Sequence, residues 1–136
     1  MPALSLSNII PIENRIFNIR GVPVMLDSDL AKMYQVDTKV LNQAVKRNLE
    51  RFPEMFLFKL NEEEWLSLRS QFVTLKGERG QHRKYLPFVF TEQGVAMLSA
   101  VLKSHVAVNV SVQIMEAFVQ LRKSGILLSG ISQRVD

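Results

Sequence analysis

The sequence contains no cysteine and only two histidines among its 136 residues. The lack of cysteine excludes disulfide bonds, thiolate metal sites and a cysteine nucleophile. The histidines, His82 and His105, are isolated, and no carboxylates recur at metal-ligand spacing, so the pattern does not indicate a metal centre. We therefore expect neither a metal nor a cofactor.

Signals for a small-molecule enzyme are also missing. The segment GERG at residues 77–80 is too short for a glycine-rich phosphate loop, and no serine stands at a revealing distance from a histidine. The glutamates at residues 62–64 fit the first turn of a helix, where carboxylates complement the helix dipole, better than a magnesium site. The sequence predicts a protein that is not an enzyme and takes no small-molecule substrate.

Long apolar runs are absent as well. The apolar stretches fall far short of the roughly 20 residues that a membrane helix needs. The start, MPALSLSNIIPIENR, lacks the basic region that precedes the apolar part of a secretory signal. We expect a cytoplasmic protein with no membrane partner.

The sequence is rich in hydrophobic residues, which make up 47% of a chain long enough for one compact domain with its own core. We divide it into an N-terminal leader at residues 1–14, a domain at 15–123 and a tail at 124–136. The tail shows no clear hydrophobic period, so we predict no structure for it.

Positive charge is concentrated in two short stretches. Residues 39–51 carry four Lys or Arg against one Glu, and residues 76–84 have the same balance. The whole chain has 17 Lys and Arg against 13 Asp and Glu, a net charge of only +4, so the rest of the chain is net negative. Charge concentrated in this way indicates a polyanion footprint.

The domain begins with a pattern that predicts a β-hairpin and a short helix. IFNIR and VPVML, on either side of Gly21, have the composition of two short strands joined by a tight turn. Pro23 predicts an edge or bulge position for the second strand. Either Asp27 or Ser28 can cap the helix that follows. Its apolar face is expected to hold Leu30, Met33 and Tyr34.

A second helix is predicted after a break at Val36 and Asp37, with Thr38 as its cap and an end near Leu49. The inward side chains are expected to be Val40, Leu41, Ala44, Val45 and Leu49. The opposite face carries Lys39, Asn42, Gln43, Lys46 and, toward its edge, Arg47. The two helices have helix-turn-helix proportions, and amide and basic side chains suit base edges and phosphates. An ordinary solvated helix fits the same spacing equally well, so spacing leaves both interpretations open.

Residues 55–60 predict a strand, and Asn61 caps the next helix, whose apolar side is expected to hold Trp65, Leu66 and Leu68. Apolar segments at 71–75 and 85–90 predict the arms of a second hairpin. Its tip carries Lys76, Arg79, His82, Arg83 and Lys84. Such a tip could lie on phosphates as a wing beside a helix-turn-helix, or serve as a solubilising loop.

Two helices complete the domain. Thr91 and Glu92 open the first, and Gly94 within it permits close packing. Its inward side chains are expected to be Val95, Leu98, Val101 and Leu102. Residues 106–121 alternate as a strand would, but one narrow polar strip at helical spacing favours a helix with a wide apolar face. The fold class predicted is α+β: a small single domain with a helix-turn-helix-like pair, short antiparallel strands including a basic hairpin, and packed C-terminal helices.

Several segments, in order, resemble one known family. They are LAKMYQVDTKVLNQAVKRNLERFPEMFLFKLNEEEW, LRSQ, RKYLPFVFTEQGVAMLSAVLKS and IMEAFVQLRK. Together they resemble the ORF6N domain, a phage-associated relative of the KilA-N DNA-binding modules, over residues 16–123. Members of that family commonly continue past the LRK position into a charged helical region, where this chain has GILLSGISQRVD.

The resemblance implies a DNA-binding module of a phage or mobile-element regulatory protein. With the charge pattern, it predicts that double-stranded DNA is the partner. The expected contacts are Lys39, Asn42, Gln43 and Lys46 in a groove, with Arg47, Arg51, Lys76, Arg79, His82, Arg83 and Lys84 in the basic elements around it. The alternative is an antirepressor that binds a repressor protein or forms a homodimer. Its partner surface would be the apolar stripe Val108, Val112, Met115 and Val119.

Overall fold

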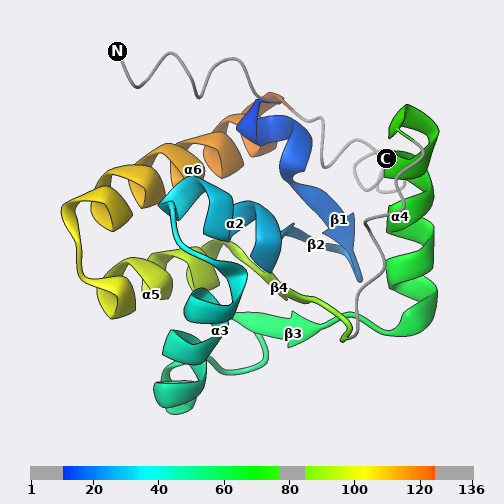
Figure 1. Cartoon of the computed structure of the whole chain (residues 1–136). Helices are drawn as coiled ribbons and strands as arrows, with labels where there is room; N and C mark the ends of the chain where they lie inside the picture. The colour runs from blue at the N-terminus through cyan, green and yellow to red at the C-terminus, as the bar shows by residue number, and fades with distance from the viewer. Residues whose placement is uncertain (1–10, 77–84, 125–136) are drawn as a thin grey trace.

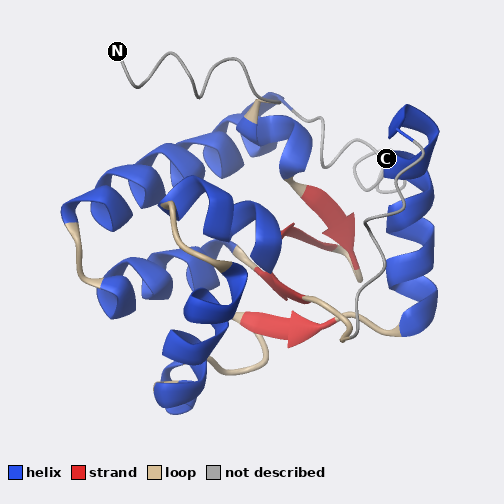
Figure 2. Cartoon of the chain, in the orientation of Figure 1, coloured by secondary structure: helices blue, strands red, loops and turns tan. Residues whose placement is uncertain are grey.

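The computed structural model of the chain describes residues 11–76 and 85–124, which form a sheet with helices on both faces (Figures 1 and 2). The sheet is antiparallel, with strand order β1-β2-β4-β3. Its strands are β1 (Phe17–Ile19), β2 (Val22–Leu26), β3 (Leu57–Lys59) and β4 (Phe88–Phe90). The α-helices are α2 (Asp27–Tyr34), α3 (Thr38–Arg47), α4 (Glu62–Lys76), α5 (Glu92–Leu102) and α6 (His105–Ser124). The 3-10 helices are η1 (Ile12–Arg15) and η2 (Leu49–Arg51). The α+β prediction is confirmed.

The two faces of the sheet build two hydrophobic cores, because successive strand residues point to opposite sides. Phe90 joins the larger core, formed with α2, α3, α5 and α6, whereas its neighbour Val89 joins the smaller core under α4 with Trp65 and Leu68. Figure 1 shows α4 by itself on one side of the sheet and the other α-helices gathered on the opposite side. The helices therefore form two separate outer layers.

The first hairpin is confirmed, with a two-residue turn at Arg20 and Gly21. Both residues have positive φ, 57° and 77°, as a primed hairpin turn requires. The edge or bulge position expected from Pro23 does not apply to β2 as a whole, because β2 lies between β1 and β4. Pro23 is accommodated because β4 pairs only with the end of β2, at Met25 and Leu26.

The predicted start of α4 is confirmed by a reciprocal capping box. The Asn61 side chain accepts from the Glu64 amide at 2.7 Å, and the Glu64 carboxylate accepts from the Asn61 amide at 2.9 Å. Glu64 also forms an ion pair with Arg20 at 2.8 Å, which ties the hairpin turn to α4. This hydrogen bond with Arg20 lowers the pKa of Glu64. The glutamate at this position thus has a structural role.

The expectation of a second hairpin arm at residues 71–75 is wrong, because α4 continues through them to Lys76. The reason is visible in the spacing: apolar residues recur at Trp65, Leu68, Phe72 and Leu75, at steps of three and four. Leu66, expected on the apolar side, is exposed because it falls between these positions. The proposed hairpin tip at 77–84 lies outside the described residues.

The α2–α3 pair forms as predicted, but its caps and part of its inward face differ. Asp27, Ser28 and Thr38 lie inside their helices, and neither helix has a side-chain cap hydrogen bond. Val40 and Leu49, expected inward, are 47% and 58% exposed. Val40 lies outside the one buried stripe of α3, and Leu49 lies beyond the end of α3, in η2. That stripe consists of Leu41 and Val45.

The C-terminal helices pack against each other and against the larger core. Residues 106–121 are helical, so the helix interpretation is correct and the strand alternation is incidental. Thr91 caps α5 by accepting from the Gly94 amide at 3.2 Å. The buried Tyr34 and Ser111 hydroxyls lie 2.6 Å apart and join α2 to α6. No helix among the described residues is long and apolar enough to cross a membrane.

Candidate nucleic-acid interface

The outward face of α3 is polar and basic along its length. Lys39, Gln43, Lys46 and Arg47 are exposed, while Leu41 on the opposite side is completely buried. At 100° per residue the face is centred on Gln43. Because Lys46 and Arg47 lie in the last turn, their charges also complement the helix dipole. The basic character of this face is therefore compatible with a stable helix.

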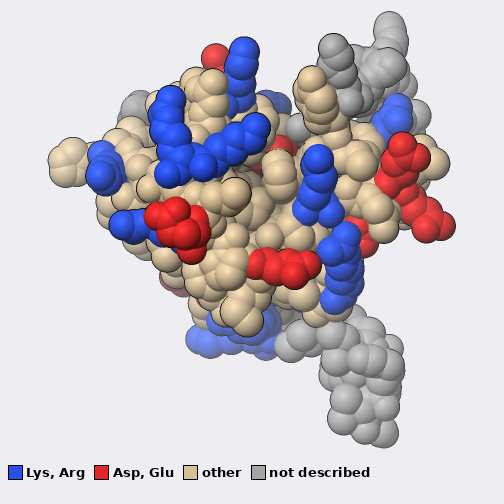
Figure 3. All heavy atoms as spheres, turned by 90° about the horizontal axis from the view of Figure 1, so that it is seen from below, with Lys and Arg blue, Asp and Glu red and all other residues tan. Residues whose placement is uncertain are grey.

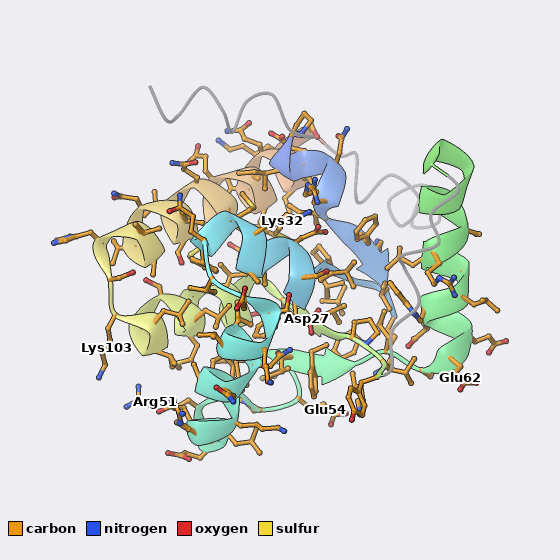
Figure 4. The ribbon with its side chains drawn as sticks, viewed as in Figure 1. Asp27, Lys32, Arg51, Glu54, Glu62 and Lys103 are labelled. Carbon is orange, nitrogen blue, oxygen red and sulfur yellow. The ribbon has the colours of Figure 1, made fainter. Side chains whose placement is uncertain are left out.

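The basic face continues beyond α3 into η2, where Arg51 is exposed. Figure 3 views the molecule from below, the side on which α3 and η2 lie in Figure 1. Lys and Arg gather most densely at the upper left of this view, next to acidic atoms. Further Lys and Arg lie to the right of its centre, and acidic side chains gather at the right edge. Figure 4 places Glu62, at the start of α4, toward that right edge. The densest group of basic side chains in this view is thus away from the acidic start of α4.

A buried aspartate fixes how α3 sits on the fold. Asp27, only 1% exposed, begins α2 and accepts from the Asn42 side-chain amide at 3.0 Å and from the Phe88 backbone amide at 3.3 Å. One carboxylate oxygen therefore links α2, α3 and β4. Because a buried acceptor needs such partners, these contacts hold the orientation of α3 relative to the sheet.

Asn42 consequently differs from the other predicted groove residues. It is half-buried, and its amide is already bound to Asp27. The sequence spacing places it on the polar side of the helix but could not show this internal partner. Asn42 therefore positions α3, and the exposed amide on the outward face is that of Gln43.

The second basic stretch does not extend this face among the described residues. Lys76 is the last residue of α4, and in Figure 1 that end of α4 is on the far side of the molecule from α3. The remaining predicted wing residues, Arg79, His82, Arg83 and Lys84, lie outside the described residues.

Lys103 is a basic residue that the sequence did not single out. It ends α5 in the left-handed conformation, with φ of 45°, and is exposed. In Figure 4 Lys103 and Arg51 both project outward at the lower left, and α5 packs against α3. An isolated lysine gives no charge-cluster signal in the sequence. Lys103 reaches the side of the molecule that holds Arg51 because α5 packs on α3.

The apolar stripe predicted on the last helix is partly exposed. Val108 and Val112 of α6 are 48% and 60% exposed, whereas Met115 and Val119 are half-buried. The wide apolar face is therefore covered on only one side among the described residues. In the same part of the chain, no group of three or more His, Cys, Asp or Glu could hold a metal.

In a comparison with protein families, the model of the ORF6N domain matches residues 14–101. The match begins within η1 and ends one residue before the end of α5, so it contains α2 and α3. The helix α6 lies beyond it. No curated protein and no solved structure gives a significant match.

Proposed function

We propose that this chain, which belongs to the ORF6N domain family, is a DNA-binding module that lays α3 in a groove of duplex DNA. Membership of the family indicates a phage-type regulatory or antirepressor-like protein. The single observation that carries the DNA proposal is the face of α3. It exposes Lys39, Gln43, Lys46 and Arg47 while its other face is anchored in the core.

The roles differ along this surface. Gln43 lies at the centre of the outward face. Its side-chain amide has a donor and an acceptor that can both pair with an adenine edge in the major groove. Lys39, Lys46 and Arg47 flank it and suit phosphates or guanine edges. Arg51 in η2 extends the basic surface beyond the end of α3 and suits a phosphate. The link from Asp27 to Asn42 supports the proposal, because a reading helix must be held at a fixed angle.

Salt dependence of binding tests this proposal. Each phosphate contact releases counterions, so the logarithm of affinity for duplex DNA should fall with the logarithm of salt concentration with a slope several units negative. Lys46→Ala should reduce the magnitude of that slope by about one.

Lys123→Ala is the matched control, because Lys123 is an exposed lysine in the last turn of α6, remote from α3 in Figure 1. It should leave the slope unchanged. An undetectable or salt-independent interaction with duplex DNA would contradict the proposal. An equal effect of the two substitutions would contradict the assignment to α3.

A second function is supported by the exposure of Val108 and Val112 on α6. In this proposal the apolar stripe is the interface of a homodimer, called the seam below, or the surface by which an antirepressor binds a repressor. Exposed apolar side chains on one helix stripe are typical of helix-to-helix contacts between subunits. The two functions are compatible, since a dimer would present two α3 helices to DNA.

The mass of the protein in solution tests the seam. The wild-type protein should sediment as a dimer, and Val108→Glu with Val112→Glu should give a folded monomer. Leu66→Glu is the control, because Leu66 is also 60% exposed but lies on α4. A wild-type monomer at micromolar concentration would contradict the dimer. Loss of the dimer with Leu66→Glu alone would contradict the location of the seam.

A further inference from the structure

Val40 stands in the outward half of α3, where the charged and amide side chains lie. It is 47% exposed, and the core beneath the helix is completed without it by Leu41 and Val45. A single exposed apolar residue is ordinary on a protein surface. Val40, however, lies among the proposed DNA contacts, so its side chain would face the DNA.

The helical period shows which residues surround Val40. Gln43 and Arg47 are three and seven residues further along, so they lie on the same stripe as Val40, one and two turns on. Lys39 and Lys46 lie on the other side of Gln43 at 100° per residue. The outward face therefore has an apolar group next to its central amide, with Arg47 further along the same stripe and the two lysines on the other side of Gln43.

Thymine is the base that an apolar side chain recognises in the major groove. Its 5-methyl group is an apolar feature of the groove edge, and its partner adenine presents the donor and acceptor that a glutamine amide can pair with. Val40 and Gln43 are one helical turn apart, so one helix can present both groups to the same stretch of groove.

We infer that Val40 contacts the 5-methyl group of a thymine, and that α3 thereby prefers sites containing A·T pairs. This inference rests on the proposed docking of α3 in the major groove. It assigns a specificity role to a side chain whose apolar character by itself predicts a core position. Basic neighbours bind any sequence through phosphates, whereas this contact distinguishes bases.

The test compares two duplexes of about 20 base pairs, long enough for two helical turns. One has an alternating adenine-thymine sequence, and the other carries deoxyuridine in place of every thymidine. They differ in the 5-methyl group and share the same phosphates and hydrogen-bonding edges. Burial of one methyl group predicts about three- to fourfold tighter binding of the thymine duplex by the wild-type protein.

Val40→Ala should bring that ratio close to one, and alanine is a good helix former, so α3 should remain folded. Leu66→Ala is the control, because Leu66 is an exposed apolar residue on α4, on the other side of the sheet from α3 in Figure 1, and it should keep the wild-type ratio. Equal wild-type binding to both duplexes would overturn the inference and leave DNA binding standing. A ratio that persists in Val40→Ala would also overturn it. Binding to neither duplex would overturn the proposed function itself.

Discussion

Replacing Gly94 with alanine should destabilise the protein even though alanine favours helices. A Cβ built on Gly94 would lie 2.1 Å from the Phe56 carbonyl oxygen and 3.0 Å from its carbonyl carbon. That oxygen cannot easily move away, because it accepts from the Thr91 amide at 3.0 Å and from the Thr91 hydroxyl at 3.2 Å. The contact therefore forces α5 away from the residues before β3.

The magnitude follows from three contributions. Alanine gains about 1 kcal/mol over glycine in helix propensity. Overpacking against backbone costs about 1–3 kcal/mol, and the two Thr91 hydrogen bonds that would be strained contribute about 1 kcal/mol each. The net loss in the free energy of unfolding should be about 2–4 kcal/mol.

Urea unfolding followed by circular dichroism measures this loss. At an m value of about 1.5 kcal/mol/M the midpoint should fall by more than about 1 M. Gly21→Ala is the matched control, because Gly21 has φ of 77° but nothing within 4 Å of its added Cβ. It should cost only about 1 kcal/mol, from the left-handed backbone. A Gly94→Ala protein as stable as the wild type would refute the close packing of α5 on Phe56.

Three other substitutions test contacts that hold the fold. Asn42→Ala removes a donor from the buried Asp27 carboxyl group and should lower the free energy of unfolding, measured in urea, by about 1–3 kcal/mol. Burial raises the pKa of Tyr34 from 10.0 to about 12, so the folded state binds more protons than the unfolded state between these values. Wild-type stability should therefore fall as pH rises above 10, and in urea titrations Tyr34→Phe should lose less stability over that window. Arg20 lowers the pKa of Glu64 below its ordinary 4.5, so this contribution is present above that pH and lost in acid. The stability difference between wild type and Glu64→Gln should accordingly shrink between pH 7 and pH 3 in urea titrations.

Each of these expectations has a result that would contradict it. Gln43→Ala, an exposed amide on the same helix, is the control for Asn42→Ala and should change stability by less than about 0.5 kcal/mol. Equal effects of the two would mean that the Asp27 contact contributes little. The same alkaline profile in Tyr34→Phe, or an unchanged acid profile in Glu64→Gln, would argue against the corresponding contact.

Local chemistry made much of the fold predictable. Gly21 between two β-rich segments identified the first hairpin, and the Asn61 cap followed by glutamates identified the start of α4. The continuation of α4 through residues 71–75 was not predicted. The short apolar run there was interpreted as a hairpin arm, although the helical spacing continues from Trp65 and Leu68. The helical spacing that identifies this part of α4 is therefore present in the sequence.

The candidate site was predictable only in part, because its details depend on tertiary contacts. Spacing correctly placed Gln43 and Lys46 on the outward face of α3. It could not show that Asn42 is held by Asp27, fifteen residues away, or that Lys103 is carried by a helix packed on α3. Val40 was predicted to lie in the core because it is apolar. In the structure the buried stripe of α3 is too narrow to include it.

NMR mapping of the DNA contact tests directly whether α3 is the DNA-binding surface. Titration of the labelled protein with a duplex should shift backbone amide resonances of α3, residues 38–47, and of η2, residues 49–51. Resonances in the last turns of α6 should remain in place, because in Figure 1 that end of α6 lies away from α3. Shifts confined to α6, or no shifts at all at physiological salt, would contradict the assignment of α3 as the DNA-binding surface.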